Sequence, residues 1–189
     1  KGQKVNHLAV GDRVVAAMAP GSLASFVTVP GAHVIPKPRG IGFKAAATIT
    51  TTFLTAFHGL VNLACLQPGE RVLIHAAGGG VGMAALQLAK EKGCVIFATA
   101  SRSKWDLLKA MGANHVMDSR SLDFVGEIRD HTQGQGVDVI LNSLTGEFID
   151  HSFSVLTEGG RFVEIGKIGV WNPKDVAARR PDAAYYLFD

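Results

Sequence analysis

The spacing of hydrophobic and polar positions changes near residue 43. Before it, short β-type runs cover residues 13–18 and 22–29, and Pro20-Gly21 separates them. Two or three short strands are only marginally stable alone. We therefore expect residues 1–42 to be a fragment of a β domain, with the chain starting inside that domain.

From residue 43 onward, helical segments alternate with short apolar runs. Helices are expected over residues 45–66, 81–92, 103–111, 122–131 and 146–156, with a short one beginning near Pro173. Strands are expected over residues 71–75, 94–100, 115–117, 137–141, 161–165 and 185–188, with a turn at Gly159-Gly160. Strict alternation predicts parallel pairing with right-handed crossovers, and nearly continuous apolar strands predict a sheet covered on both faces. The pattern predicts a doubly wound, Rossmann-type α/β fold.

A glycine-rich turn lies between the first expected strand of this region and the helix that follows it. Read as a dinucleotide fingerprint, it is Ala77-x-Gly79-x-x-Gly82, with alanine in place of the first glycine. Gly79 would let the backbone approach a pyrophosphate, and Gly82 would let helix and strand pack closely. A tight turn without a ligand is the alternative, but consecutive glycines cost backbone entropy that a plain turn does not require.

The next expected strand favours NADPH over NADH. Where an NAD enzyme carries Asp or Glu, this chain has Ser101, followed by Arg102 and Lys104. Hydroxyls and cations bind a 2′-phosphate, whereas a carboxylate repels it. The alternative is that both cations are ordinary solvated residues, although a cation at a helix N-terminus is mildly unfavourable.

Composition excludes several other classes of protein. With 47% hydrophobic and 19% charged residues, the chain of 189 residues is globular rather than disordered. It has no uncharged apolar run of about 18 residues, so a membrane span is not expected. The net charge is +3 and the basic residues are scattered, which disfavours nucleic-acid binding. Cys65 and Cys94 are too few for a disulfide framework or a cysteine-rich zinc site, which suits a reducing, cytoplasmic location.

Several segments carry a family resemblance. Residues 54–56 and 67–85 resemble the medium-chain dehydrogenase/reductase superfamily. Residues 118–124, 136–144 and 159–167 (GGRFVEIGK) look like the enoyl reductase domains of modular polyketide synthases. The enoyl reductase of animal fatty acid synthase is similar but less close.

The resemblance implies two domains. Residues 1–42, with Gly11-Asp12-Arg13-Val14 as marker, look like the end of a GroES-like substrate-binding domain. Residues 43–189 look like the NADPH-binding Rossmann domain. The front of the substrate domain and the C-terminal return into it are expected to be missing.

The resemblance also implies a reaction, the reduction of a trans-2-enoyl thioester on an acyl carrier protein beside neighbouring synthase domains. Neither a metal nor a nucleic-acid or membrane partner is expected. Lys167 and Asp189 match the family's catalytic Lys and Asp, although Ile168-Gly169 stand where members commonly have Thr-Asp. The expected cofactor-binding residues are Thr55, Ala77, Gly79, Gly80, Val81, Gly82, Ser101, Arg102, Lys104, Arg120, Asn142, Ser143 and Gly166.

Two other functions remain open at the level of sequence. A stand-alone NADPH quinone oxidoreductase of the same superfamily shares the glycine turn and uses no carrier protein. A non-catalytic cofactor-binding domain is the third possibility, and the presence of Lys167 argues against it. A plain salt bridge between strand ends is the alternative role for Lys167 and Asp189.

Overall fold

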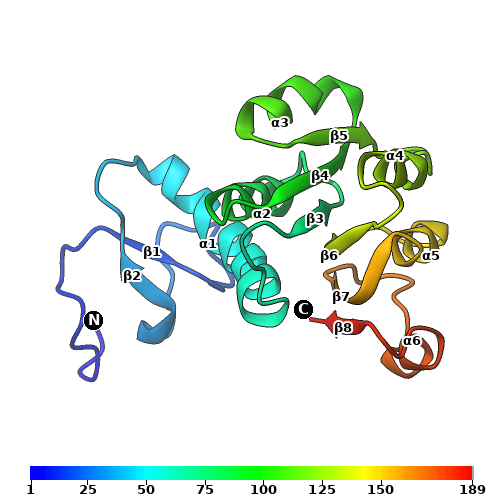
Figure 1. The fold of residues 1–189 in the computed structure, drawn as a ribbon. Coiled ribbons are helices and arrows are strands. Elements are labelled where there is room, and N and C mark those ends of the chain that lie inside the picture. The colour runs from blue at the N-terminus through cyan, green and yellow to red at the C-terminus, as the bar shows by residue number, and fades with distance from the viewer. Residues whose placement is uncertain (189) are drawn as a thin grey trace. The chain divides into compact units, whose positions relative to one another are not determined.

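The computed structural model describes residues 1–188 and divides into two compact units, Lys1–Leu54 and Thr55–Asp189 (Figure 1). Helix α1, Phe43–Phe57, belongs to both units. The identity of the first unit as part of a GroES-like domain stays a prediction.

The first unit holds one small antiparallel sheet. Strand β1, Val14–Ala16, pairs with β2, Val34–Pro36, and a 3₁₀ turn, η1 Gly31–His33, precedes β2. The expected strand over residues 22–29 is wrong, because β1 pairs with β2 instead and residues 22–29 contain no strand. Leu23 and Phe26 in that segment are fully exposed, so their apolar side chains pack against nothing that would hold a strand in place.

The second unit is built on one six-stranded sheet in the order β5-β4-β3-β6-β7-β8, in which every neighbouring pair is parallel. Its strands are β3 Arg71–Ile74, β4 Val95–Ala100, β5 His115–Asp118, β6 Val137–Asn142, β7 Leu156–Glu164 and β8 Ala184–Leu187. Numbered from β3, this is the strand order of the doubly wound dinucleotide-binding fold. The structure thus confirms the predicted fold class.

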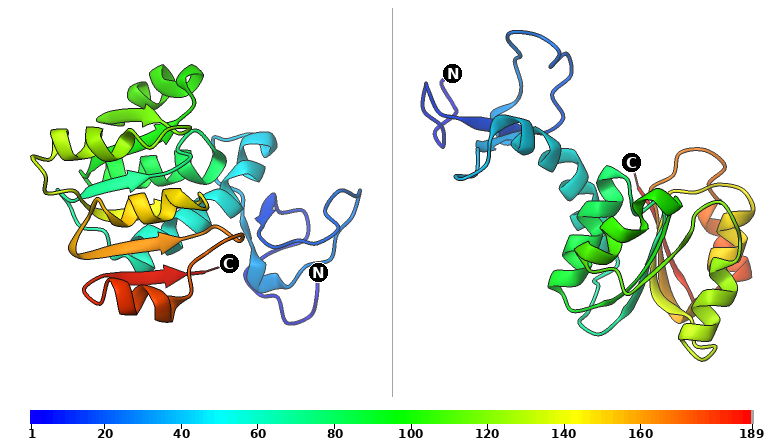
Figure 2. Two further views of the ribbon diagram at one scale, coloured as in Figure 1. Left: turned by 90° about the vertical axis from the view of Figure 1, so that its right-hand side faces the viewer. Right: turned by 90° about the horizontal axis from the view of Figure 1, so that it is seen from above.

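Helices cover both faces of this sheet, as Figure 2 shows from above. They are the π-helical turn η2 His58–Leu63, α2 Gly80–Glu91, the 3₁₀ turn η3 Arg102–Lys104, α3 Trp105–Met111, α4 Phe124–His131, α5 Glu147–Phe153 and α6 Pro173–Arg179. Helices α2 and α3 end before Gly93 and Gly112, whose φ angles of +73° and +118° suit the left-handed turn that terminates a helix.

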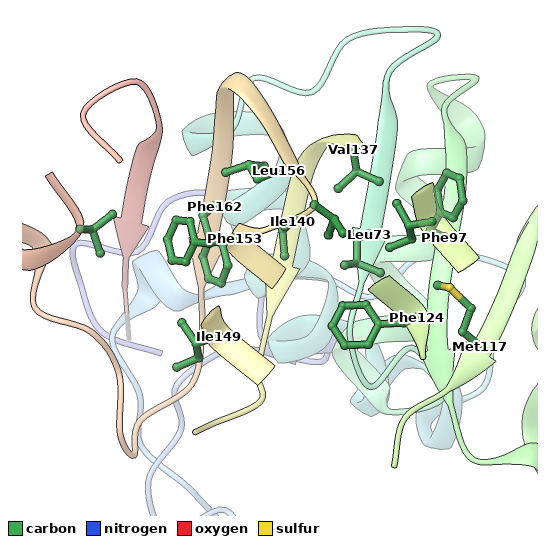
Figure 3. Packing of buried hydrophobic residues seen from close by; sticks show 13 residues of the cluster. Leu73, Phe97, Met117, Phe124, Val137, Ile140, Ile149, Phe153, Leu156 and Phe162 are labelled. Carbon is green, nitrogen blue, oxygen red and sulfur yellow. The ribbon is translucent and has the colours of Figure 1, made fainter. Parts of the chain in front are cut away.

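Alternate strand residues fill the core on the face covered by α4 and α5 (Figure 3). Leu73, Phe97, Ile140 and Phe162 occupy paired positions on adjacent strands and are all buried. Phe153 of α5 stacks on Phe162, with ring centroids 4.3 Å apart. The strand residues that alternate with these four point to the opposite face of the sheet. Both faces are apolar, because helices cover a parallel sheet on both sides.

Three expected elements differ from the observed ones. The helix expected over residues 146–156 ends at Phe153, and β7 begins at Leu156, which pairs with Val137. The glycine turn expected at residues 159–160 lies within β7, where the register against β6 shifts and Gly159 has a φ of +70°. The helix expected over residues 45–66 is α1 followed by η2, because the chain widens into a π-helical turn at His58.

Candidate functional site

The predicted site residues between Ala77 and Lys167 follow the carboxyl ends of the strands, at one edge of the sheet. Parallel strands end at the same edge, so the loops after β3, β4, β5, β6 and β7 lie together there. Strand order reverses between β3 and β6, and ligands of doubly wound sheets bind outside the carboxyl ends of the strands at such a switch point.

The glycine loop joins β3 to the N-terminus of α2. A Cβ on Gly82 would lie 2.5 Å from Ala77 Cα and 2.6 Å from Ala76 O, so only glycine allows this close approach of helix to loop. Gly79 is the N-cap of α2, and its carbonyl accepts the Met83 amide at 2.9 Å. The amides of Gly80, Val81 and Gly82 precede that bond, in the position that binds phosphate at a helix N-terminus. The loop therefore fits the pyrophosphate of a dinucleotide.

The loop begins with a left-handed residue, Ala76, and buried Thr99 of β4 supports this part of the loop through hydrogen bonds. Ala76 has a φ of +48°, a conformation that costs a non-glycine residue energy. Its amide donates to Thr99 Oγ1 at 3.3 Å, and the Ala77 amide donates to Thr99 O at 2.9 Å. Strand β4 thus supports the start of the loop that follows β3.

His75 completes a hydrogen-bond chain beneath this loop. Its Nδ1 lies 3.0 Å from Thr99 Oγ1, and its Nε2 lies 2.8 Å from Ser152 Oγ on α5. Because Ser152 Oγ donates to Phe148 O at 2.6 Å, it accepts from His75 Nε2–H. The Thr99 hydroxyl then donates to Nδ1, so one neutral tautomer satisfies every group. Burial lowers the pKa of His75 to about 3, which keeps the ring neutral. These contacts give His75 a supporting, hydrogen-bonding role beneath the loop.

The expected phosphate-binding residues follow β4 and β5. The Lys104 side chain lies against Gly78, and its Nζ donates to Gly78 O at 2.7 Å. Arg102 is exposed and lies 3.5 Å from Asp118, the last residue of β5, in an ion pair that water screens. Ser101 Oγ is 3.4 Å from Ser103 Oγ, and Arg120 is exposed after β5. Lys104 thus lies beside the glycine loop, and Arg102 lies at the end of β5.

The loops after β6 and β7 meet at a buried carboxylate. Asn142 is fully buried and donates from Nδ2 to Glu164 Oε2 at 2.7 Å. Gly166 donates its amide to Glu164 Oε1 at 2.6 Å. Because these contacts occupy the Asn142 amide, a direct contact between Asn142 and a cofactor ribose stays a prediction, as does one from the half-buried Ser143.

The remaining predicted residues are placed as follows. Lys167 is exposed directly after Gly166, beyond the end of β7. Thr55 is half-buried in the last turns of α1. Asp189 lies outside the described residues. The catalytic and cofactor-binding roles of all these residues stay predictions.

Within residues 1–188, no group of three or more His, Cys, Asp and Glu side chains is arranged to hold a metal ion. In the same residues, no helix combines the length and apolar character that a membrane crossing needs.

Comparison with known proteins gives the family. The family model described as zinc-binding dehydrogenase matches residues 80–182, more than half of the chain. The chain belongs to the zinc-binding dehydrogenase family. The family's name implies a zinc ion, but the described residues hold no ligand set that fits one, so we derive no chemical step through a metal.

The relatives are polyketide synthases and their enoyl reductase domains. Phenolphthiocerol synthesis polyketide synthase type I Pks15/1 of Mycobacterium bovis is 46% identical over 190 residues, which cover 100% of this chain and 9% of the synthase. The CurK enoyl reductase crystal structure has a TM-score of 0.96 at 54% identity and covers 100% of this chain and 57% of its own. The nucleotide-binding subdomain of the PpsC enoylreductase domain from Mycobacterium tuberculosis has a TM-score of 0.67 at 48% identity, covering 73% of this chain and 79% of its own. These matches confirm the resemblance to polyketide synthase enoyl reductases, of which the chain spans only a part.

Sequence reasoning missed three polar residues that support the site. Thr99 and Ser152 hold His75, and Glu164 joins two loops. The signal for Glu164 was present, since a carboxylate interrupts an otherwise apolar strand. Thr99 and Ser152 gave no signal, because their partners are 24 and 77 residues away in the chain.

We predict that Gly82→Ala lowers the free energy of unfolding by about 1–3 kcal/mol, because its Cβ would collide with the backbone of Ala76 and Ala77. Chemical denaturation measures the change. The control is Gly126→Ala in α4, where a Cβ meets nothing within 4 Å. That variant should be unchanged or up to ~1 kcal/mol more stable. Equal stability of Gly82→Ala and the wild type would contradict the close approach.

Acid should destabilise the fold through His75. Between pH 6.5 and about 3 the unfolded chain binds a proton at this residue and the native chain does not, so stability falls as the pH falls. The contribution approaches ~1.4 kcal/mol per pH unit below pH 6.5. Urea denaturation between pH 7 and 4 should give a flatter pH dependence for His75→Gln than for the wild type, while His151→Gln on α5 keeps the wild-type dependence. Parallel curves for His75→Gln and the wild type would rule out a neutral buried His75.

Proposed function

We propose that the chain is the nucleotide-binding part of an NADPH-dependent enoyl reductase. The reaction is reduction of the 2,3 double bond of a trans-2-enoyl thioester carried on an acyl carrier protein during polyketide assembly. The observation that carries this proposal is the glycine loop at the switch point, closed by Gly82 and flanked by Lys104. The 54% identity to the CurK enoyl reductase supports the reaction class over the quinone oxidoreductase alternative.

The proposed assembly follows from the relatives. Because the chain covers 9% of the Pks15/1 synthase, its partners are proposed to be neighbouring synthase domains and an acyl carrier protein. Residues 1–42 are proposed to be a fragment of the GroES-like substrate domain and residues 43–189 the NADPH-binding domain, acting in the cytoplasm.

The residues of this chain are proposed to hold the cofactor and to move a proton. Amides of Gly80, Val81 and Gly82 bind the pyrophosphate, while Ser101, Arg102 and Lys104 bind the 2′-phosphate. The hydride for the β carbon of the enoyl thioester would come from NADPH held by these residues. The resulting enolate takes a proton at its α carbon, and Lys167 is the proposed donor, with Asp189 orienting it or acting in its place.

Lys104→Glu should weaken NADPH binding far more than NADH binding, because the new carboxylate faces the 2′-phosphate that only NADPH carries. Fluorescence titration of both cofactors measures the two affinities. Lys174→Glu, on the exposed surface of α6, makes the same change in net charge and should leave the ratio of the affinities unchanged. Equal wild-type affinity for NADH and NADPH would refute the cofactor assignment.

The proton donors should show a characteristic pattern of turnover. The assay uses the whole enoyl reductase domain with a crotonyl-type thioester and saturating NADPH. General acid catalysis is worth ~10²–10⁴-fold, and Lys167→Ala or Asp189→Ala alone should lose less than this because the other residue or water still delivers the proton. The double variant should lose more than either single variant.

The control for this assay is Lys174→Ala, which should keep the wild-type turnover. If the double variant of Lys167 and Asp189 also keeps it, neither residue is the donor, and a residue of the substrate domain outside residues 1–189 becomes the stronger candidate.

A further inference from the structure

One carboxylate joins the two loops that carry Asn142, Ser143, Gly166 and Lys167, which are predicted to bind the cofactor or to donate the proton. Glu164, the last residue of β7, is fully buried. Its Oε2 accepts from Asn142 Nδ2 at 2.7 Å, and its Oε1 accepts from the Gly166 amide at 2.6 Å. Asn142 ends β6, and Gly166 directly precedes Lys167. Glu164 therefore contacts both loops through separate oxygens.

Asn142 extends this link into the loop after β6. Its Nδ2 also donates to Leu144 O at 2.9 Å, and its Oδ1 accepts from the Leu144 amide at 3.1 Å. Both the carbonyl and the amide of Leu144 are thus bound by a side chain that Glu164 itself holds. Displacing the carboxylate releases the Ser143–Leu144 backbone as well as the turn before Lys167.

Burial of the Glu164 carboxylate costs folding free energy, which indicates that this residue has a role other than stabilising the fold. Burial raises the pKa of Glu164, while the hydrogen bonds from Asn142 and Gly166 lower it. The two donors that bind its oxygens, the Asn142 side-chain amide and the Gly166 N–H, are both neutral. A buried carboxylate costs folding free energy that an apolar residue at the end of β7 would avoid.

The glycine at position 166 is a second observation pointing to the same contact. A Cβ there would lie 2.7 Å from Glu164 Oε1, closer than real Cβ atoms approach. The backbone of Gly166 has no left-handed φ that would demand glycine for another reason. The carboxylate therefore explains this glycine, independently of any contact with a cofactor.

We propose that Glu164 is a positioning residue of the cofactor site, which fixes the Asn142–Leu144 loop and the Gly166–Lys167 turn relative to each other. It does not touch the reacting atoms. This inference rests on the proposed function, because the geometry it preserves matters only if these loops meet the cofactor and the enoyl substrate.

Exchange of the hydrogen-bonding partners tests the proposal. In Glu164→Gln one oxygen becomes an NH₂ group, which faces either the Asn142 NH₂ or the Gly166 N–H and cannot accept. In Asn142→Asp two carboxylates face each other. When both changes are made together, the glutamine NH₂ donates to the new aspartate, and the glutamine oxygen accepts from Gly166, so complementarity between the two side chains returns.

NADPH affinity of the chain is the first readout. Each single variant should bind about tenfold more weakly, which corresponds to one buried polar group left without its partner. The double variant should bind more tightly than Asn142→Asp alone, because the contact between the two side chains returns, whereas the Leu144 carbonyl that Asn142 Nδ2 also binds stays without this donor. The control, Glu158→Gln, changes an exposed glutamate on the same strand and should bind as the wild type does. Unchanged affinity in both single variants, or a double variant that is weaker than both, would overturn the proposal.

Amide NMR of the wild type gives a readout that does not require the variants to fold. Adding NADPH should shift the Gly166 and Leu144 amide signals together, since the carboxylate couples the two loops. NADPH that binds while both signals stay fixed overturns the positioning role alone. A wild-type chain that binds no NADPH at all overturns the proposed function, so the two failures are distinct.

Discussion

The whole candidate site depends on the parallel pairing of β3 with β4 on one side and with β6 on the other. This pairing places the carboxyl ends of all the neighbouring strands at one edge and makes β3 the switch point of the sheet. The glycine loop after β3 then lies between the basic residues after β4 and the loops after β6 and β7. None of these segments is close to the others in sequence, so the pairing alone brings them together.

The loops at this edge are held by buried polar side chains rather than by packing alone. His75 supports the glycine loop from Thr99 and Ser152, and Glu164 joins the loops after β6 and β7. Each of these groups would cost folding free energy if its partners were absent. Such contacts define a single loop geometry, because a displaced loop leaves a buried donor or acceptor unsatisfied.

The type of an element could be predicted from the sequence where the hydrophobic pattern of its segment was strong. The prediction failed where pairing with a distant segment determined the secondary structure. The order of strands and helices from β3 to β8 follows from the alternation of apolar runs and glycine-ended helices. The segment of residues 22–29 has β-type residues but forms no strand, since β1 pairs with β2. The start of β7 was missed because Leu156 reads as the end of a helix, while its pairing with Val137 makes it a strand residue.

The sequence by itself determined the fold class, the glycine loop and the cations that follow β4, because these depend on local spacing and on backbone freedom at Gly82. Only the tertiary structure decided which polar residues support them. The contacts of His75 with Ser152 and of Glu164 with Asn142 join positions 77 and 22 residues apart. No local pattern encodes such a pair, since a hydrogen bond between side chains depends on the folded distance between them and not on their separation along the chain.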